Sequence, residues 1–452
     1  MEKIIDNLSE EDLKSLIKSH LISEDPKLSL ISKSISSFSP SDIKEKAKLN
    51  TIIQSSQKEI STLHSMLDEL EKPEIKALAP KHPIRVYIDG VFDIIHSGHF
   101  NAIRQAKKLG DILVVGVNSD SDVMKVKGPT LMNQNERAAL AAACKWTDEV
   151  AVGTLYTPTI QMLDDLKCDY CSHGDDIPYN EKGESCYDEI MKAGRMKLFK
   201  RTEGVSTTTI IGRLLLCAKE NTLKKKEKVE MTTSSELIKQ FAELDEFEKN
   251  KKPVMSSFLA TSWRITEFSN NKIPKSGDKI IYIDGAFDIL HIGHVETLKK
   301  AKEMGDFLYV GVHDDFTVNK YRGKNYPILN LNERVFNLLA LKYVDEVIIG
   351  SPWKVTEDLI KSLKINLVVQ GTTPKLDPEQ NYSDIKPEDD PYEIPKKLGI
   401  YQTIQSNYDL SNDVLIERLM KNRELYIQKY LNKAKKDNDF FAQDVKEEIK
   451  EI

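Results

Sequence analysis

The chain has 452 residues, of which 30% are charged and 40% hydrophobic, and its formal net charge is −6. These values are ordinary for a globular protein of two to four domains, and they give no general case for nucleic-acid binding. The sequence has no long apolar run and no signal-peptide pattern, and its number of cysteines is odd. We therefore expect a cytoplasmic protein without integral membrane contact.

Residues 1–80 contain no glycine, and we expect them to form a helical N-terminal extension. Ser39-Pro40-Ser41-Asp42 is typical of a helix start, and Ile53, Ile60 and Leu67 then recur every seven residues. A helix that packs on its own body and a short coiled-coil seam both fit this pattern.

From residue 84 onward, short apolar segments alternate with amphipathic ones. The former predict strands at 85–88, 111–117, 149–152 and 170–173, and the latter predict helices at 99–109, 135–145 and 157–167. This alternation indicates an α/β fold with a parallel sheet and helices on both faces. Ligands of such folds bind at the carboxyl ends of the strands, where His96, His99, Tyr156 and His173 fall.

The whole pattern occurs twice. His96-Ser97-Gly98-His99 corresponds to His291-Ile292-Gly293-His294, and Asn135-Glu136-Arg137 corresponds to Asn332-Glu333-Arg334. A repeat of this length indicates a duplicated domain rather than a solenoid. We therefore expect a first domain over 84–218, a linker over 219–276, a second domain over 277–425 and a charged helical tail over 426–452.

Two motifs of the first domain suit phosphate binding. Tyr87–His99 combines a strand, a glycine turn and two histidines at a helix start, where free N–H groups and the helix dipole favour anions. Arg201–Thr207 places a guanidinium and a row of hydroxyls before a helix, with Ser206 or Thr207 as its cap. Lys127 supplies a further cation from a loop. Either motif alone could simply cap a helix, but their combination predicts a nucleotide phosphate site.

Cys168 and Cys171 have C-x-x-C spacing, but no second pair follows at zinc-finger distance. We therefore expect no metal site made by the protein's own residues.

Together these motifs resemble the cytidylyltransferase family of nucleotidyltransferases. The resemblance spans roughly residues 84–430 and includes Lys127-Gly128-Pro129, Lys145–Val150 and Arg201–Thr207. The duplication is characteristic of the family's ethanolamine-phosphate branch. It implies two tandem Rossmann-like nucleotidyltransferase domains and the reaction CTP + phosphoethanolamine → CDP-ethanolamine + diphosphate, a step of phosphatidylethanolamine biosynthesis.

The resemblance also implies roles for individual residues of the first domain. His96 and His99 would stabilise the triphosphate, Lys127 would bridge the phosphates of both substrates, and Arg201 would hold the β- and γ-phosphates. The implied CTP contacts are Val91, Phe92, His99, His173, Gly174, Asp175, Asp176, Gly204, Val205, Ser206 and Thr207. The implied phosphoamine pocket is Asp89, Tyr156 and Tyr179. A Mg²⁺ ion is expected to accompany CTP.

The second domain departs from this set. Arg322 stands opposite Lys127, and Ser406 stands opposite Arg201. By resemblance this domain still holds CTP, through Ala286, Phe287, His294, Gln370, Gly371, Thr372, Thr373, Ser406, Asn407, Tyr408, Asp409 and Leu410. We expect it to have lost most or all of its turnover.

Two alternatives stay open. One is a phosphocholine enzyme: Tyr156 stands where choline enzymes of the family carry tryptophan, which favours ethanolamine, but Asp176-Ile177-Pro178-Tyr179 looks choline-like. The other is a CTP-sensing regulator without turnover. The expected partners are CTP and phosphoethanolamine, with no nucleic acid. A homodimer and a peripheral position at the endoplasmic reticulum are also open.

Overall fold

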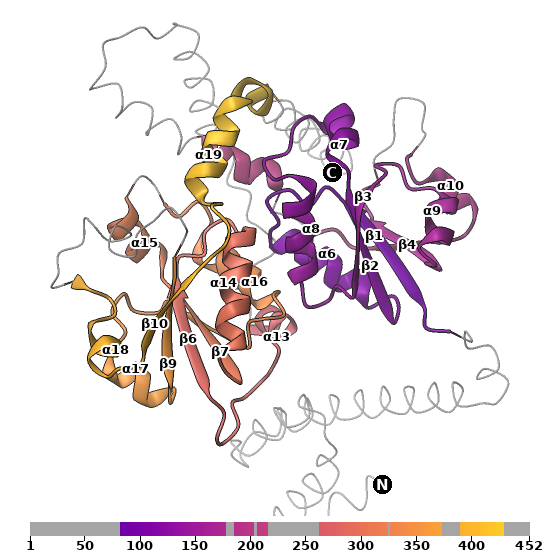
Figure 1. The fold of residues 1–452 in the computed structure, drawn as a ribbon. Helices are drawn as coiled ribbons and strands as arrows, with labels where there is room; N and C mark the ends of the chain where they lie inside the picture. The colour runs from indigo at the N-terminus through magenta and orange to yellow at the C-terminus, as the bar shows by residue number, and fades with distance from the viewer. Residues whose placement is uncertain are drawn as a thin grey trace, which may run out of the picture. The chain divides into compact units, whose positions relative to one another are not determined.

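The computed structural model describes residues 82–177, 185–202, 206–215, 262–323, 326–372 and 389–428 (Figure 1). These residues all belong to one compact unit, His82–Ile452. The expected N-terminal extension and nearly all of the expected tail lie outside the described ranges. Within those ranges, no helix is both long and apolar enough to span a bilayer.

The first lobe is a five-stranded parallel sheet with its connecting helices. Its elements are β1 (Arg85–Gly90), α6 (Ser97–Lys107), β2 (Ile112–Asn118), α7 (Asp120–Lys127), α8 (Gln134–Ala143), β3 (Glu149–Thr154), α9 (Ile160–Asp165), β4 (Tyr170–Gly174), α10 (Asp188–Lys192), β5 (Met196–Phe199) and a final helix over 207–215.

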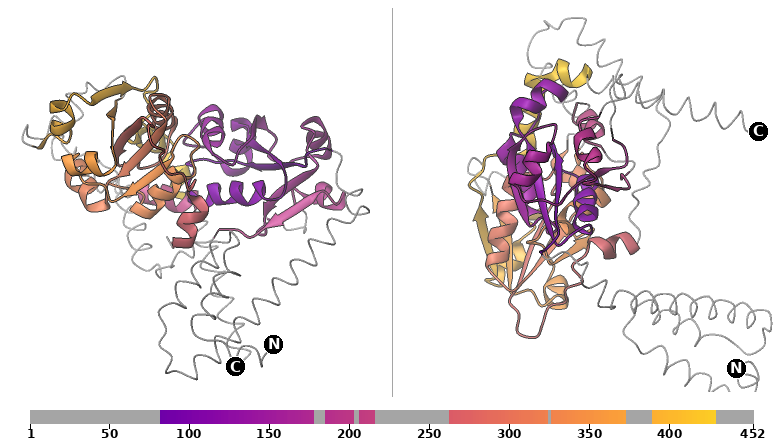
Figure 2. Two further views of the ribbon diagram at one scale, coloured as in Figure 1. Left: turned by 90° about the horizontal axis from the view of Figure 1, so that it is seen from below. Right: turned by 90° about the vertical axis from the view of Figure 1, so that its right-hand side faces the viewer.

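The second lobe repeats this order. Its elements are β6 (Ile280–Gly285), α14 (Ile292–Glu303), β7 (Phe307–Val312), α15 (Asp315–Arg322), α16 (Leu331–Leu339), β8 (Glu346–Ile349), α17 (Glu357–Ser362), β9 (Leu367–Thr372), α18 (Glu393–Lys397), β10 (Tyr401–Gln405) and α19 (Asn412–Lys421). Figure 2 shows both sheets from two further sides.

The strand order places the site in each lobe. The sheets run β3-β2-β1-β4-β5 and β10-β9-β6-β7-β8, and all neighbours are parallel. The chain winds outward from β1 in one direction and then returns to β4 on the other side. Such a switch point opens a crevice at the carboxyl ends of the two central strands. The His-x-Gly-His segments follow β1 and β6, so they lie at this crevice, and the α/β prediction is confirmed.

The two lobes share a hydrophobic core. Cys144 and Leu341 form an antiparallel bridge, in which Lys145 N donates to Ala340 O at 2.9 Å. Part of the expected linker is the helix α13 (Ser262–Phe268), and its Phe268 ring packs edge-on against Trp146 and Phe336. This segment therefore helps to join the lobes.

One expectation about local structure is wrong. Lys127 does not lie in a loop; it is the last residue of α7. The Ser119 side chain caps this helix by accepting from Asp122 N, and acidic residues in the first turn complement the helix dipole. Gly128 then ends the helix at a φ of 80°, a conformation that glycine adopts without strain.

Candidate functional site

The turn after each central strand is held in an unusual backbone conformation. Phe92 and Ile94 have φ values of 50° and 46°, and their counterparts Phe287 and Ile289 have 47° and 34°. Positive φ is uncommon for residues other than glycine, and for a β-branched isoleucine it is strained. Such strain persists only where surrounding contacts over-determine it, and it is concentrated at functional sites.

Two buried side chains hold this turn in the first lobe. Arg137 of α8 is fully buried and donates to the carbonyl oxygen of Val91. Asp93 accepts the backbone N–H groups of Leu131 and Met132, at 2.9 and 3.0 Å. The two bonds to Asp93 tie the turn to the loop that follows Lys127, so the two histidines and the lysine are positioned together.

The two histidines begin α6, as predicted. His96 is the N-cap residue, and its Nδ1 accepts from Gly98 N at 3.1 Å. A neutral ring bonded in this way carries its hydrogen on Nε2. The His96 and His99 rings stack with centroids 4.0 Å apart. Burial and then the charges of Lys127 and Arg201 lower the pKa of His99 to about 3. His99 is therefore neutral at physiological pH, and the positive charge beside it comes from the lysine and arginine.

Both predicted cations lie close enough to act on His99. Lys127 Nζ lies 5.3 Å from the centre of the Tyr156 ring. Arg201 forms an ion pair with Asp176, and its backbone N–H donates to Asp175 Oδ1 at 2.9 Å. Ser206 caps the following helix, since its Oγ accepts from Thr209 N at 3.2 Å.

Asp89, predicted for the phosphoamine pocket, lies near the end of β1, and its carboxylate is buried. The Tyr187 hydroxyl donates to Asp89 Oδ1 at 3.0 Å, and Asn118 Nδ2 lies 3.5 Å from Oδ2. Burial raises the pKa of Asp89, and the bond from Tyr187 opposes that shift. The His173 ring packs against Tyr187 with centroids 4.8 Å apart.

Sequence reasoning missed Tyr187 and Asn118. Tyr187 corresponds to Tyr392 of the second copy, so alignment of the two copies could have identified it. The Tyr392 hydroxyl bonds Asp284 of the second lobe in the same way. The predicted site residues Tyr179, Gly204, Val205 and Thr373 lie outside the described residues.

The second lobe contains a cavity of about 290 Å³ at the corresponding place. Its lining includes most of the CTP contacts predicted for this lobe, namely Ala286, Phe287, His294, Gln370, Gly371, Thr372, Ser406 and Leu410. Asn407, Tyr408 and Asp409 do not line it.

This second cavity differs from the first site in two ways that bear on a triphosphate. His291 lacks the side-chain cap bond that His96 makes. Glu296 takes the place of Asn101, and its carboxylate accepts from Ser406 Oγ at 2.9 Å and from Asn407 N at 2.7 Å. Where the first lobe has an arginine, the second therefore has a serine beside a carboxylate that is paired with Lys300 at 3.1 Å. The guanidinium that could hold an anion is missing from this position.

Comparison with known proteins agrees with this geometry. A family model described as cytidylyltransferase-like matches residues 87–213 and again residues 282–408. The ethanolamine-phosphate cytidylyltransferase of Dictyostelium discoideum is 45% identical over 80% of this chain and 98% of its own length. That of Arabidopsis thaliana is 43% identical over 81% and 87%. The human choline-phosphate cytidylyltransferase A is also 43% identical, but over only 30% of this chain and 37% of its own length.

Both copies of the motif, the strand order and the full-length relatives thus lead to one conclusion. The chain belongs to the cytidylyltransferase-like family of nucleotidyltransferases, in the branch of the ethanolamine-phosphate cytidylyltransferases.

Proposed function

We propose that the first lobe transfers the cytidylyl group of CTP to phosphoethanolamine, giving CDP-ethanolamine and diphosphate. The observation that carries this proposal is the joint presence of His96, His99, Lys127 and Arg201 around one strained turn. The extent of the match supports the choice of substrate. The ethanolamine-phosphate relative matches 80% of this chain, whereas the choline-phosphate relative matches only 30% of it.

The chemistry needs no general base. The nucleophile is a phosphomonoester oxygen whose second pKa is about 6, so it is largely deprotonated at neutral pH. The protein must hold two anions in line and stabilise the charge that grows on the leaving diphosphate. His96 and His99 donate N–H groups to the triphosphate from the start of α6. Lys127 neutralises charge shared by the two substrates, and Arg201 holds the β- and γ-phosphates.

The amine pocket favours a primary ammonium. A primary ammonium offers three N–H donors, and Asp89 offers a buried carboxylate to accept them. Lys127 already lies over the Tyr156 ring, so that aromatic face is shared with the protein's own cation. A trimethylammonium, which is bound chiefly by aromatic faces, would compete with the lysine there.

The described residues contain no group of three His, Cys, Asp or Glu side chains that could hold a metal ion. Asp93, three residues before His96, uses both oxygens on backbone N–H groups. The side chains described here therefore do not form a cage for Mg²⁺. The ion that the family implies would enter on the phosphate oxygens of CTP, the usual mode for magnesium.

The second lobe, in this proposal, binds CTP weakly through His294 and the residues at the end of β9, with little or no turnover. The absence of an arginine at Ser406 supports it, because this absence weakens the hold on the β- and γ-phosphates, and the Ser406 hydroxyl is already bonded to Glu296.

Matched double variants test this division. Lys127→Ala with Arg201→Ala should lower kcat/KM by at least about 100-fold, the usual loss when a transition-state donor is removed. Arg322→Ala with Ser406→Ala alters the same two positions of the second lobe and should cost less than about threefold. Equal losses would refute the division between the lobes.

The substrate is tested by diphosphate release from CTP with phosphoethanolamine or with phosphocholine. A kcat/KM at least about tenfold higher with phosphoethanolamine is expected. A preference for phosphocholine would overturn the substrate, and no release with either would favour a CTP-sensing regulator.

A further inference from the structure

The second-lobe cavity has one end that CTP binding does not explain. Asp284 lines it and is only 8% exposed. Its Oδ1 accepts from the Tyr392 hydroxyl at 2.6 Å, whereas its Oδ2 has no hydrogen-bond partner among the described residues. The Tyr282 hydroxyl lies near enough to influence the pKa of Asp284, but it does not meet hydrogen-bond geometry with Oδ2. A buried carboxylate in this state favours a cationic group beside it, because the positive charge offsets the cost of burying the negative one.

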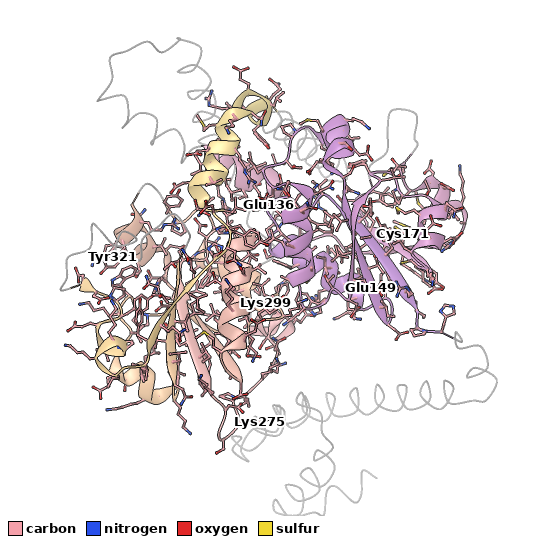
Figure 3. The ribbon with its side chains drawn as sticks, in the orientation of Figure 1. Glu136, Glu149, Cys171, Lys275, Lys299 and Tyr321 are labelled. Atoms are coloured by element: carbon pink, nitrogen blue, oxygen red, sulfur yellow. The ribbon has the colours of Figure 1, made fainter. Side chains whose placement is uncertain are left out.

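Aromatic rings form the wall of the same end. Tyr321, on α15 (Figure 3), stacks on Trp353 with centroids 3.8 Å apart and planes 9° apart. The His313 ring lies 5.4 Å from Trp353, and all three residues line the cavity. Trp353 Nε1 donates to the carbonyl oxygen of Asp389 at 3.2 Å, which fixes the indole ring. The wall is therefore preorganised, so a ligand does not have to order it.

The corresponding wall of the first lobe is different. There Lys127 Nζ lies 5.3 Å from the Tyr156 ring, which occupies the position of Trp353. In the second lobe the equivalent cation, Arg322, lies instead over the Tyr326 ring at 4.7 Å. The arginine is thus directed to another ring, and the second lobe combines tryptophan, tyrosine and a buried carboxylate. This combination binds cations whose charge is spread over methyl groups.

The other end of the cavity suits a phosphate. His291 and His294 line it at the start of α14, a helix of 12 residues, and Arg322 lines it as well. The Nδ1 atoms of both histidines are buried without a hydrogen-bond partner among the described residues. Free helix N–H groups, imidazole donors and a guanidinium can together hold a dianion.

We propose that this cavity binds the phosphomonoester of a quaternary ammonium alcohol, with the methylated ammonium against Asp284 and Trp353 and the phosphate at the start of α14. Both charges of such a ligand meet opposite charge, and its methyl groups meet aromatic faces. The site is separate from the first-lobe amine pocket and does not require turnover in the second lobe.

The test measures the binding of phosphocholine to the full chain in the absence of CTP, by calorimetry and by tryptophan fluorescence. We expect saturable binding that Asp284→Asn and Trp353→Leu each weaken about tenfold or more, and that Trp353→Phe weakens less because it keeps an aromatic face. The matched first-lobe variants, Asp89→Asn and Tyr156→Leu, should leave this binding within about twofold. Phosphoethanolamine should bind this site at least about tenfold more weakly than phosphocholine.

Three results would overturn the proposal. They are no phosphocholine binding at millimolar concentration, equal losses from Trp353→Leu and Trp353→Phe, or sensitivity to the first-lobe variants instead. Melting curves of these five variants show whether a loss reflects unfolding. The proposed reaction is measured separately as diphosphate release from CTP and phosphoethanolamine, so either hypothesis can fail while the other stands.

Discussion

Asp93 links the strained turn to the loop after Lys127, and its replacement tests whether that link positions the catalytic groups. Both oxygens accept backbone N–H bonds, from Leu131 at 2.9 Å and Met132 at 3.0 Å, and the side chain is 6% exposed. In Asp93→Asn the amide can accept only one of these bonds. The variant should therefore lose about 2–4 kcal/mol of folding free energy, from one charged hydrogen bond and one buried N–H left without an acceptor.

The second lobe provides the matched control. Asp288 accepts from Ile328 N at 2.7 Å and from Leu329 N at 2.9 Å, so Asp288→Asn breaks the same contacts. Both variants should lower the melting temperature by similar amounts, about 4–16 °C. Only Asp93→Asn should also lower kcat/KM, by about 10- to 100-fold, because displacement of a positioning loop by about 1 Å has effects of that size.

The assay is diphosphate release at a temperature where both variants are folded, as judged by circular dichroism. If the two variants lose stability alike and also lose activity alike, the effect is one of general destabilisation, and the reasoning about Asp93 is wrong. If Asp93→Asn keeps full activity, the bond to the loop does not position Lys127.

Two further predictions concern the contact between the lobes and the histidine platform. Arg418 donates to both oxygens of Glu136, at 2.7 and 2.9 Å; Figure 3 labels Glu136 beside α8. Arg418→Ala should therefore lower first-lobe kcat/KM about three- to tenfold, whereas Arg213→Ala, whose partners lie in the second lobe, should have a smaller effect in the same assay. Burial holds the pKa values of His99 and His294 at about 3, whereas an unfolded histidine has a pKa of about 6.5. The unfolded chain therefore binds more protons below pH 6.5, and the free energy of unfolding should fall by up to about 2 kcal/mol per histidine at pH 5. Urea unfolding at pH 7.5 and pH 5 should show a smaller drop for His99→Gln, and an unchanged drop would contradict the pKa assignment.

The links between the lobes are reciprocal, which the sequence suggested only as a matching pair of arginines. Arg213 of the first lobe contacts Glu333, and Arg418 of the second contacts Glu136. Each glutamate also completes the capping box of its own helix, with Asn330 or Asn133. Each glutamate therefore caps the N-terminus of its own helix and also contacts the other lobe.

The sequence by itself determined the fold class, the duplication and the pair of histidines at the start of α6. These features are local: alternating strands and helices follow from periodicity, and His96 and His99 follow a strand and begin a helix within four residues of each other. Because the strand, the turn and the helix start are contiguous in the sequence, the motif has the same local geometry in both copies, and its chemistry can be inferred before the structure is known.

Only the tertiary structure decided which distant groups meet. Tyr187 reaches Asp89 across 98 residues, and Asp93 reaches the loop at Leu131 across 38. Lys127 lies on a helix over the Tyr156 ring rather than in a loop, while its counterpart Arg322 lies over a different ring. Periodicity carries no information on such pairs, because packing between separate elements selects them. For the same reason, two lobes that share one motif place different side chains around it.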